Sequence, residues 1–394
     1  MAILLSDAGL HGHLLPLTHT RPVGALRAGI LPFAQAWQQL TGLPVGFHTE
    51  PYLQGKYPAV EAHHVLEVHG GLLPNPALAA AVLDLEPGQV LVQAGKPLAF
   101  CLEGGARADA LHWTLAPSYL TPVEYQADVH AVERPWHLFQ HCAKAIAYDM
   151  ALLCEGRQSA ALSPTNTVLG DPRLLFLEAG AKVEASILNT TGGPIWIGPQ
   201  AEVMEGCLVR GPLALGQGAQ LKMGAKIYGP SSFGPYCRVG GEVNNSVILG
   251  YSNKGHDGFL GHSVLGEWCN LGADTNTSNL KNTYGQVQAW SHAAHALVPT
   301  GQQFLGLVMG DHAKSGINTM FNTGTVAGVC ANIFGSGFPP KHIPGFSWGG
   351  NGTYALEKAL ETGQLVMQRR GVALGPEDRQ ILTHVYHLTE RDRT

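Results

Sequence analysis

The chain has 394 residues, of which 13% are charged, and a formal net charge of −5. No basic stripe with interleaved aromatic residues is present, which excludes a nucleic-acid partner, and no apolar run reaches the roughly 18 residues of a transmembrane helix. Seven cysteines without ligand spacing argue against a disulfide framework and a zinc site, and the short apolar start does not resemble a signal peptide, so we expect a cytoplasmic protein.

The first part of the chain alternates between strand-like and helix-like segments. Apolar strands are predicted at 2–5, 45–48 and 90–93, and a helix is predicted at 31–40. Such alternation is typical of an α/β sheet domain. No GxGxxG motif follows the first strand, so nothing indicates a dinucleotide-binding fold.

Large apolar residues recur every six positions in the second half of the chain, and mostly small residues follow each of them by four positions. This pattern predicts a parallel β-helix, in which triangular coils stack and bury a column of inward side chains. The eight residues of the first series are Ile197, Val203, Val209, Leu215, Leu221, Ile227, Phe233 and Val239.

The repeat then slips by two residues and resumes with Val247, Asn253 and Phe259 in the inward column. A third series, less regular, ends at Ile333. Between these two series lies an excursion at about 274–303, and long excursions from a rigid solenoid tend to carry function.

The last segment has a helical pattern. Pro376 suits the first position of a helix because it is followed by acidic residues. We expect these helices to cap the open end of the solenoid and to cover its strand edges. The predicted domains are therefore 1–175, 176–345 and 346–394.

The segment Gly255–Ala273 contains Gly-His, then an aromatic residue with Leu-Gly, then Asn-Leu-Gly-Ala. It resembles the acetyltransferase half of the bifunctional N-acetylglucosamine-1-phosphate uridyltransferase/glucosamine-1-phosphate N-acetyltransferase family. This resemblance implies a left-handed β-helix, a homotrimer, acetyl-CoA as the acyl donor and an amino-sugar phosphate as the acceptor. It places no metal in the acetyl transfer.

The same resemblance assigns the site. His256 matches the histidine that takes a proton from the attacking amine, and an imidazole suits this role because it titrates near neutral pH. Asn270 matches a second catalytic residue. Phe259 replaces a family Tyr, and Asn244 replaces a phosphate-binding Lys. The expected substrate-binding residues are Glu242, Asn244, Lys254, Phe259, Asn279 and Lys281, where Lys254 or Lys281 compensates for Asn244.

Coenzyme A is expected to lie along the solenoid between Ala313 and Ala331, contacted by backbone amides. His262 and His312 are assigned structural or solvent-facing positions, with His312 as a further candidate for lining the coenzyme A groove. These placements rest on analogy with the family.

The segment Leu15–Val23 resembles the P-L-T-x-x-x-P-K loop of sugar-1-phosphate nucleotidyltransferases. His13 stands at the place of the family Arg, and Arg21 stands near the usual Lys, so both are candidates for binding UTP or dTTP with Mg²⁺. Lys96 occupies the place of the metal-binding carboxylate, which reverses the local charge.

Three alternatives remain open at this stage. The chain is an acetyltransferase, with or without nucleotide-sugar formation, or a nucleotidyltransferase that uses the β-helix for assembly only, or a trimeric scaffold that binds a sugar nucleotide without turnover.

Overall fold

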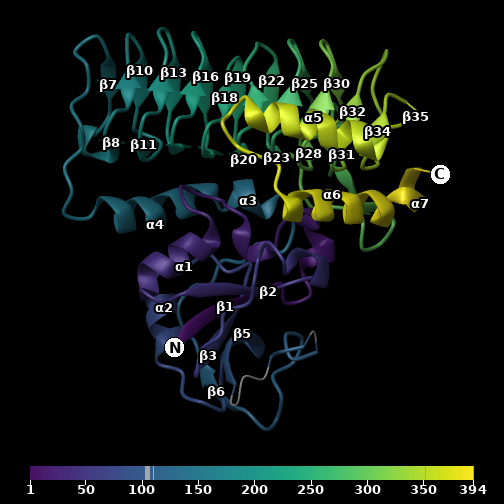
Figure 1. The fold of residues 1–394 in the computed structure, drawn as a ribbon. Coiled ribbons are helices and arrows are strands. Elements are labelled where there is room, and N and C mark those ends of the chain that lie inside the picture. Colours follow the sequence, from purple (N-terminus) through teal and green to yellow (C-terminus); the bar gives the residue numbers. More distant parts are fainter. Residues whose placement is uncertain (103–106, 110, 351, 394) are drawn as a thin grey trace.

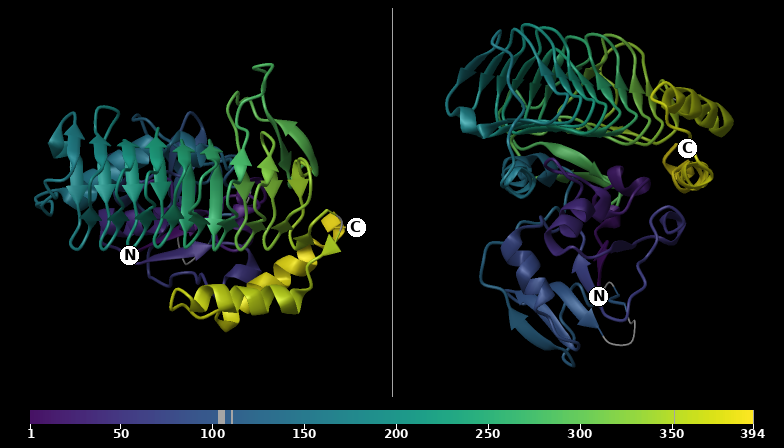
Figure 2. Two further views of the ribbon diagram at one scale, coloured as in Figure 1. Left: turned by 90° about the horizontal axis from the view of Figure 1, so that it is seen from above. Right: turned by 60° about the vertical axis from the view of Figure 1, so that its left-hand side comes forward.

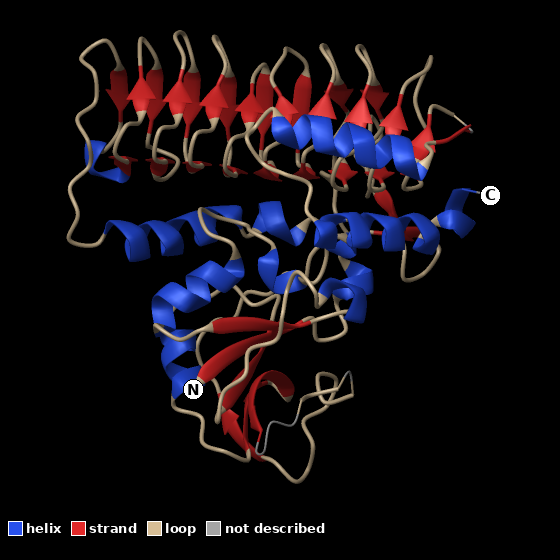
Figure 3. Ribbon diagram, in the orientation of Figure 1, coloured by secondary structure: helices blue, strands red, loops and turns tan. Residues whose placement is uncertain are grey.

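The computed structural model describes residues 1–102, 107–109, 111–350 and 352–393. An α/β domain and a long β-helix lie against each other, and two C-terminal helices run beside the β-helix (Figures 1 and 3). The predicted fold class, an α/β domain followed by a left-handed parallel β-helix and C-terminal helices, is confirmed.

The strands of the α/β domain are β1 (Ala2–Ser6), β2 (Val45–His48), β3 (Val65–His69), β4 (Gln89–Gln93), β5 (Lys96–Leu102) and β6 (Thr121–Glu124). Its helices are α1 (Phe33–Thr41), α2 (Pro76–Leu83), α3 (His137–Gln140) and α4 (Cys142–Cys154), with short 3₁₀ turns η1 (His11–His13), η2 (Leu17–His19), η3 (Val23–Ala25) and η4 (Pro51–Leu53). The sheet order is β2-β1-β3-β5-β4-β6, with β1 parallel to β2 and β3. All three predicted strands and the predicted helix are confirmed.

The β-helix has three faces, and successive coils contribute strands to each (Figure 2). The first face contains β7 (Thr167–Leu169), β10 (Ile187–Asn189), β13 (Leu208–Arg210), β16 (Lys226–Tyr228), β19 (Glu242–Asn244) and β22 (Phe259–Gly261), followed by the pair β25 (Asn276–Thr277) and β30 (Met320–Phe321). The turn η5 (Pro172–Leu174) joins β7 to the second face.

The second face contains β8 (Leu175–Leu177), β11 (Ile195–Ile197), β14 (Leu213–Leu215), β17 (Ser231–Phe233), β20 (Val247–Gly250), β23 (Val264–Glu267), β28 (Val308–Met309), β31 (Val326–Ala327) and β33 (His342–Ile343). The third face contains β9 (Lys182–Val183), β12 (Glu202–Val203), β15 (Gln220–Leu221), β18 (Arg238–Val239), β21 (Asn253–Lys254), β24 (Asn270–Leu271), β29 (Lys314–Ser315), β32 (Asn332–Ile333), β34 (Ser347–Trp348) and β35 (Gly352–Thr353).

The first series of the hexapeptide repeat forms the core as predicted. All eight residues from Ile197 to Val239 point inward and are at most 2% exposed. The small residues four positions later, such as Cys207 and Cys237, are buried beside them. Stacking coils thus produces the continuous apolar interior that a single coil cannot form.

The first three residues of the second series are displaced by one position from the prediction, whereas Leu265 and Leu271, which continue the predicted series, are buried in the core. Ile248 pairs with Phe233, and Lys254 with Val239, so the inward column passes through Ile248 and Lys254 rather than through Val247 and Asn253. Likewise Leu260 is buried where Phe259 was expected. The reason is a shortened coil: the chain reaches the inward Val243 only four residues after Val239.

Lys254 therefore lies inside the solenoid, where it is 1% exposed. Its ammonium donates hydrogen bonds to the carbonyl oxygens of Gly240 at 3.0 Å and His256 at 2.5 Å. Burial lowers the pKa of Lys254 to about 8. Its aliphatic stem fills the apolar column, while its nitrogen binds two turn carbonyls that the coil leaves free.

The second face is apolar on both sides. Strands β11 and β14 of this face are buried at every position, whereas the outer residues of β13 on the first face are exposed. Its outer side chains, among them Trp196, Val247 and Val264, share one core with Ile146 and Met150 of α4. The α/β domain is thus packed onto this face along α4 (Figure 1).

The prediction that the C-terminal helices cap the open end of the solenoid is wrong. Helix α5 (Leu356–Gln368) starts beside Trp348, near the last coil, and runs back until Arg370 reaches Asn253 several coils earlier (Figure 2). Helices α6 (Pro376–Leu388) and α7 (Glu390–Arg393) follow. These helices pack against the apolar corner of the solenoid that Trp268 and Cys330 form. Helices at the end of the solenoid would leave this corner exposed to water.

The excursion at 274–303 forms a hairpin of β26 (Gln288–Ser291) and β27 (Ala296–Pro299). Val287 and Ala289 join the core between the domains. In the described part of the chain, no helix has both the length and the apolar character needed to cross a membrane.

We predict that Lys254→Met changes the pH dependence of stability. The Lys254 side chain has a pKa near 8 when folded and an ordinary value of 10.5, so between these values the unfolded chain carries a proton that the folded chain has lost. The stability of the native chain relative to Lys254→Met should therefore rise from pH 8 to pH 10.5, by up to about 3 kcal/mol. Denaturant unfolding at several pH values measures this difference. Lys226→Met, on the exposed side of β16, is the control and should show no such rise.

Candidate active site

A cavity of about 620 Å³ lies between the third face and the end of α5. One wall consists of the outward residues of successive strands, which the parallel pairing places one above another. The opposite wall is the end of α5. Its lining residues are Lys222, Arg238, Tyr251, Asn253, Gly255, His256, Trp268, Asn270, Lys314, Val366, Arg369 and Arg370.

The charged side chains that line this cavity are all positive. Five cations line it, namely Lys222, Arg238, Lys314, Arg369 and Arg370, and no carboxylate does. Within the described residues, none of these five forms an ion pair. Burial lowers the pKa of Arg238, and the nearby charge of Arg370 lowers it further. Gathering like charges costs free energy that an anionic ligand would recover.

A chain of hydrogen bonds crosses the cavity wall. Arg370 donates from Nη2 to Asn253 Oδ1 at 2.8 Å, and Asn253 Nδ2 donates to Asn270 Oδ1 at 3.3 Å. Asn270 is thereby fixed on the wall of the cavity, and its own amide nitrogen makes no hydrogen bond to the described residues.

His256 lies at the edge of this cavity in the turn between β21 and β22, and its side chain is exposed. The buried Lys254 holds the backbone of this turn from inside, through the carbonyl of His256. In the described chain, the imidazole makes no hydrogen bond of its own, with Asn270 or with any other residue. The structure thus brings His256 and Asn270 to one cavity without a direct bond between them.

Three expected substrate-binding residues lie on the first face instead. Glu242 pairs with Phe259 across β19 and β22, and Tyr228 donates a hydrogen bond to Glu242. Asn244 accepts a hydrogen bond from Asn245. None of the three lines the cavity that contains His256. The structure brings them together with one another but not with the proposed base.

Asn279 and Lys281 lie at the start of the excursion. Asn279 Nδ2 is 2.9 Å from His262 Nδ1, and Lys281 donates to the backbone of Gln286. His262 stacks on Phe304 and is partly buried, and burial lowers the pKa of His262 to about 4. Asn279 therefore contacts a structural histidine and not His256.

Several expected contacts are contradicted. Lys254 faces the interior and is not available to a sugar phosphate. Ala313 and Ala331 are fully buried, and their amides donate to Gly310 and Gly328 across the same turn, so they do not line a coenzyme A groove. Small residues of a hexapeptide repeat fill corners of the interior, and this is why the two alanines point inward.

The prediction that Arg21 binds a nucleotide is also wrong. It is 5% exposed and forms ion pairs with Glu267, at 3.1 Å, and with Asp311. Thr20 donates to the same carboxylate of Asp311 at 2.7 Å. Burial opposes the charge of Arg21, but the two carboxylates outweigh it and raise the pKa of Arg21. Arg21 fastens the α/β domain to the β-helix and is not available to a nucleotide. His312, which is buried nearby, lines the same junction.

A separate pocket of about 170 Å³ lies at the carboxyl ends of β1 and β2, where ligands bind in open α/β sheets. Asp7, Glu50 and Asp109 line it, but Asp7 already accepts hydrogen bonds from Thr49 and the backbone of Val23. The described residues here do not bring three ligands within reach of one ion. A Mg²⁺ site is therefore not preformed.

His13, which was expected to bind the nucleotide, lies away from this pocket, and so does Lys96, the residue at the place of the metal-binding carboxylate. His13 is exposed outside it, and Lys96 is exposed at the turn between β4 and β5. Neither lines the pocket at the carboxyl ends of β1 and β2.

Sequence reasoning missed the cations of the large cavity. Arg238 and Lys314 each stand one position before an inward residue of the third face, as Asn253 and Asn270 do, so the repeat itself could have identified them. The position of Arg370 depends on how α5 packs, and no local pattern reveals this.

Comparisons with known proteins support the sequence resemblance over part of the chain. Residues 2–158 match the family described as sugar nucleotidyl transferase. The chain is 32% identical over 93 residues to a bifunctional sugar-1-phosphate nucleotidylyltransferase/acetyltransferase of Sulfurisphaera tokodaii, which is 24% of this chain and 23% of that protein. It is 32% identical over 87 residues to the bifunctional protein GlmU of Methanocaldococcus jannaschii, covering 22% and 21% of the two chains.

A third relative, the bifunctional protein GlmU of Methanococcus aeolicus, is 30% identical over 87 residues, or 22% of this chain and 20% of that protein. The chain thus spans less than a quarter of the length of each of these relatives. The resemblance to bifunctional nucleotidyltransferase/acetyltransferases is confirmed within these limits.

We predict that Arg21→Met weakens the attachment of the α/β domain. The substitution leaves Asp311 and Glu267 without their cation at a buried junction, which costs about 3–5 kcal/mol. Chemical denaturation, followed by fluorescence, should show an earlier first transition. Arg173→Met removes an ion pair with Asp171 that is fully exposed and should leave the transition unchanged. Equal effects of the two variants would contradict the assignment.

Proposed function

We propose that this chain is a transferase whose β-helix transfers an acetyl group from acetyl-CoA to the amino group of a sugar 1-phosphate. The observation that carries this proposal is the cationic cavity shared by His256 and Asn270. Both substrates of such a reaction carry phosphate groups, which match the five unpaired cations. The acetyltransferase activity named for a relative supports the same reaction class.

In the proposed reaction, His256 accepts a proton as the substrate amine attacks the thioester carbonyl. The new carbon–nitrogen bond forms as the carbon–sulfur bond breaks, and the protonated imidazole returns its proton to the departing thiolate. Asn270, held by Asn253 and Arg370, is proposed to position the sugar through its free amide. Lys254 acts as a positioning residue because it holds the turn of His256.

His256→Ala should reduce kcat by about 10²–10⁴-fold, the usual contribution of a general base. The assay follows release of free thiol from acetyl-CoA with glucosamine 1-phosphate as acceptor. His63→Ala, on an exposed loop of the α/β domain, should retain full activity. If the native chain releases no thiol with any amino-sugar phosphate, the chain is a binding scaffold or a nucleotidyltransferase only.

Arg370→Met should weaken the binding of acetyl-CoA or sugar phosphate by about tenfold, since one charge-assisted hydrogen bond is lost. Isothermal titration calorimetry measures the affinity. Lys358→Met, in α5 but paired with Glu361 and 70% exposed, should bind like the native chain. Rising salt should weaken the native interaction and narrow the difference between the native chain and Arg370→Met.

For the α/β domain we propose nucleotide binding in the pocket at the ends of β1 and β2, with UTP or dTTP as candidates and formation of a nucleotide sugar as the reaction. The family match over residues 2–158 supports this. The pocket needs rearrangement around Asp7 and Asp109 before it could hold Mg²⁺, so no step is assigned to a metal. Release of pyrophosphate from UTP or dTTP with a sugar 1-phosphate tests this proposal.

A homotrimer in the cytoplasm is the expected state of the chain.

A further inference from the structure

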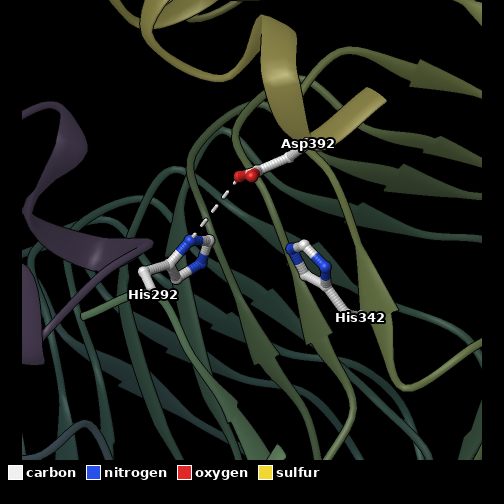
Figure 4. A group of neighbouring side chains, drawn as sticks. All are labelled: His292, His342 and Asp392. Carbon is white, nitrogen blue, oxygen red and sulfur yellow. Dashed lines mark ion pairs between the residues drawn. The ribbon is translucent and has the colours of Figure 1, made fainter. Parts of the chain in front are cut away.

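Three side chains distant in sequence converge outside both proposed sites. His292 follows β26 in the hairpin, His342 begins β33, and Asp392 lies in α7. Figure 4 shows both imidazole rings and the carboxylate turned toward a common point. One possible ligand atom from each lies within 4.8 Å of those of the other two, and His292 Nδ1 is 4.0 Å from Asp392 Oδ2. Among the described residues, this is the group that has the composition and spacing of a metal site.

Both histidines have a buried ring nitrogen without the hydrogen bond that burial normally demands. His292 is 9% exposed, and its Nε2 atom has no partner; the Nε2 atom of His342 is likewise buried and unpartnered. An unsatisfied buried polar atom costs about 1–3 kcal/mol. Two imidazoles with unsatisfied nitrogens, each with a ring nitrogen in the same group as a carboxylate oxygen, are explained if a cation belongs among them.

The surrounding structure fixes these side chains in place. The ring of His342 stacks on Trp290 with a centroid distance of 4.0 Å, and the ring of His292 packs edge-on against His19. Arg393 anchors α7 by donating to the carbonyl oxygens of Gly345 and Tyr386. The ligands therefore come from segments that other contacts hold in place.

We propose that His292, His342 and Asp392 bind one divalent transition-metal ion of the Zn²⁺ type. Two imidazoles and a carboxylate are ligands typical of this class. Tetrahedral binding at about 2.0–2.1 Å sets ligand atoms about 3.4 Å apart, so the side chains close by roughly 1 Å. His292 and Asp392 also line a cavity of about 510 Å³, which leaves room for a water molecule as the fourth ligand.

Such an ion joins the hairpin, the β-helix and the end of the chain. To test this, the full chain is stripped with a chelator and titrated with ZnCl₂ in a weakly competing buffer, and bound metal is measured by mass spectrometry. We expect one tightly held ion per chain and a rise in melting temperature of roughly 2–5 °C at saturation. Co²⁺ in its place should give the intense visible absorption of a tetrahedral site.

Asp392→Asn and His342→Ala should lower the affinity at least tenfold and remove the rise in melting temperature. His63→Ala and Asp128→Asn change exposed residues elsewhere and should bind like the native chain. If the variants fail to fold, the Co²⁺ spectrum of the native chain decides whether a tetrahedral metal site is present. An absence of tetrahedral bands, or equal Zn²⁺ binding by native chain and folded variants, would overturn the proposal.

Discussion

The second face of the β-helix must be covered on its outer side, and most of the architecture depends on this. Trp196, Val247 and Val264 point away from the solenoid interior and are buried in a core that the β-helix shares with the α/β domain. Each large apolar side chain removed from water stabilises the contact by about 1.5–3 kcal/mol. The α/β domain is therefore held by a shared core and not by a flexible linker, and its loops are positioned by the face on which it rests.

This packing explains why a loop resembling a nucleotide-binding motif has another role. The segment that contains Thr20 and Arg21 lies at the junction, where Asp311 accepts from both and Glu267 pairs with Arg21. A guanidinium suits a buried contact with two carboxylates as well as it suits a phosphate. The residues of the motif are retained, but their partners are carboxylates of the same chain.

The repeat made most of the fold predictable because the inward column must be filled by apolar side chains. The prediction failed at Lys254, which occupies an inward position although it is charged. Its aliphatic stem packs in the apolar column, and its nitrogen donates to two turn carbonyls. The pairing of His256 with Asn270 in one cavity followed from their register, whereas Arg370 could not be placed because the packing of α5 depends on contacts distant in sequence. For the same reason no sequence spacing revealed the group of His292, His342 and Asp392.

The C-terminal helices contact both halves of the molecule. Arg370 reaches Asn253 on the third face, while Lys56 of the α/β domain pairs with Asp378 in α6 at 2.6 Å, and Tyr52 stacks on His384. A ligand that binds more tightly when these helices are docked must, by thermodynamic reciprocity, strengthen the hold on the first domain by the same free energy. A ligand of this kind would couple the cavity under α5 energetically to the α/β domain, although the residues that line the cavity all lie outside that domain.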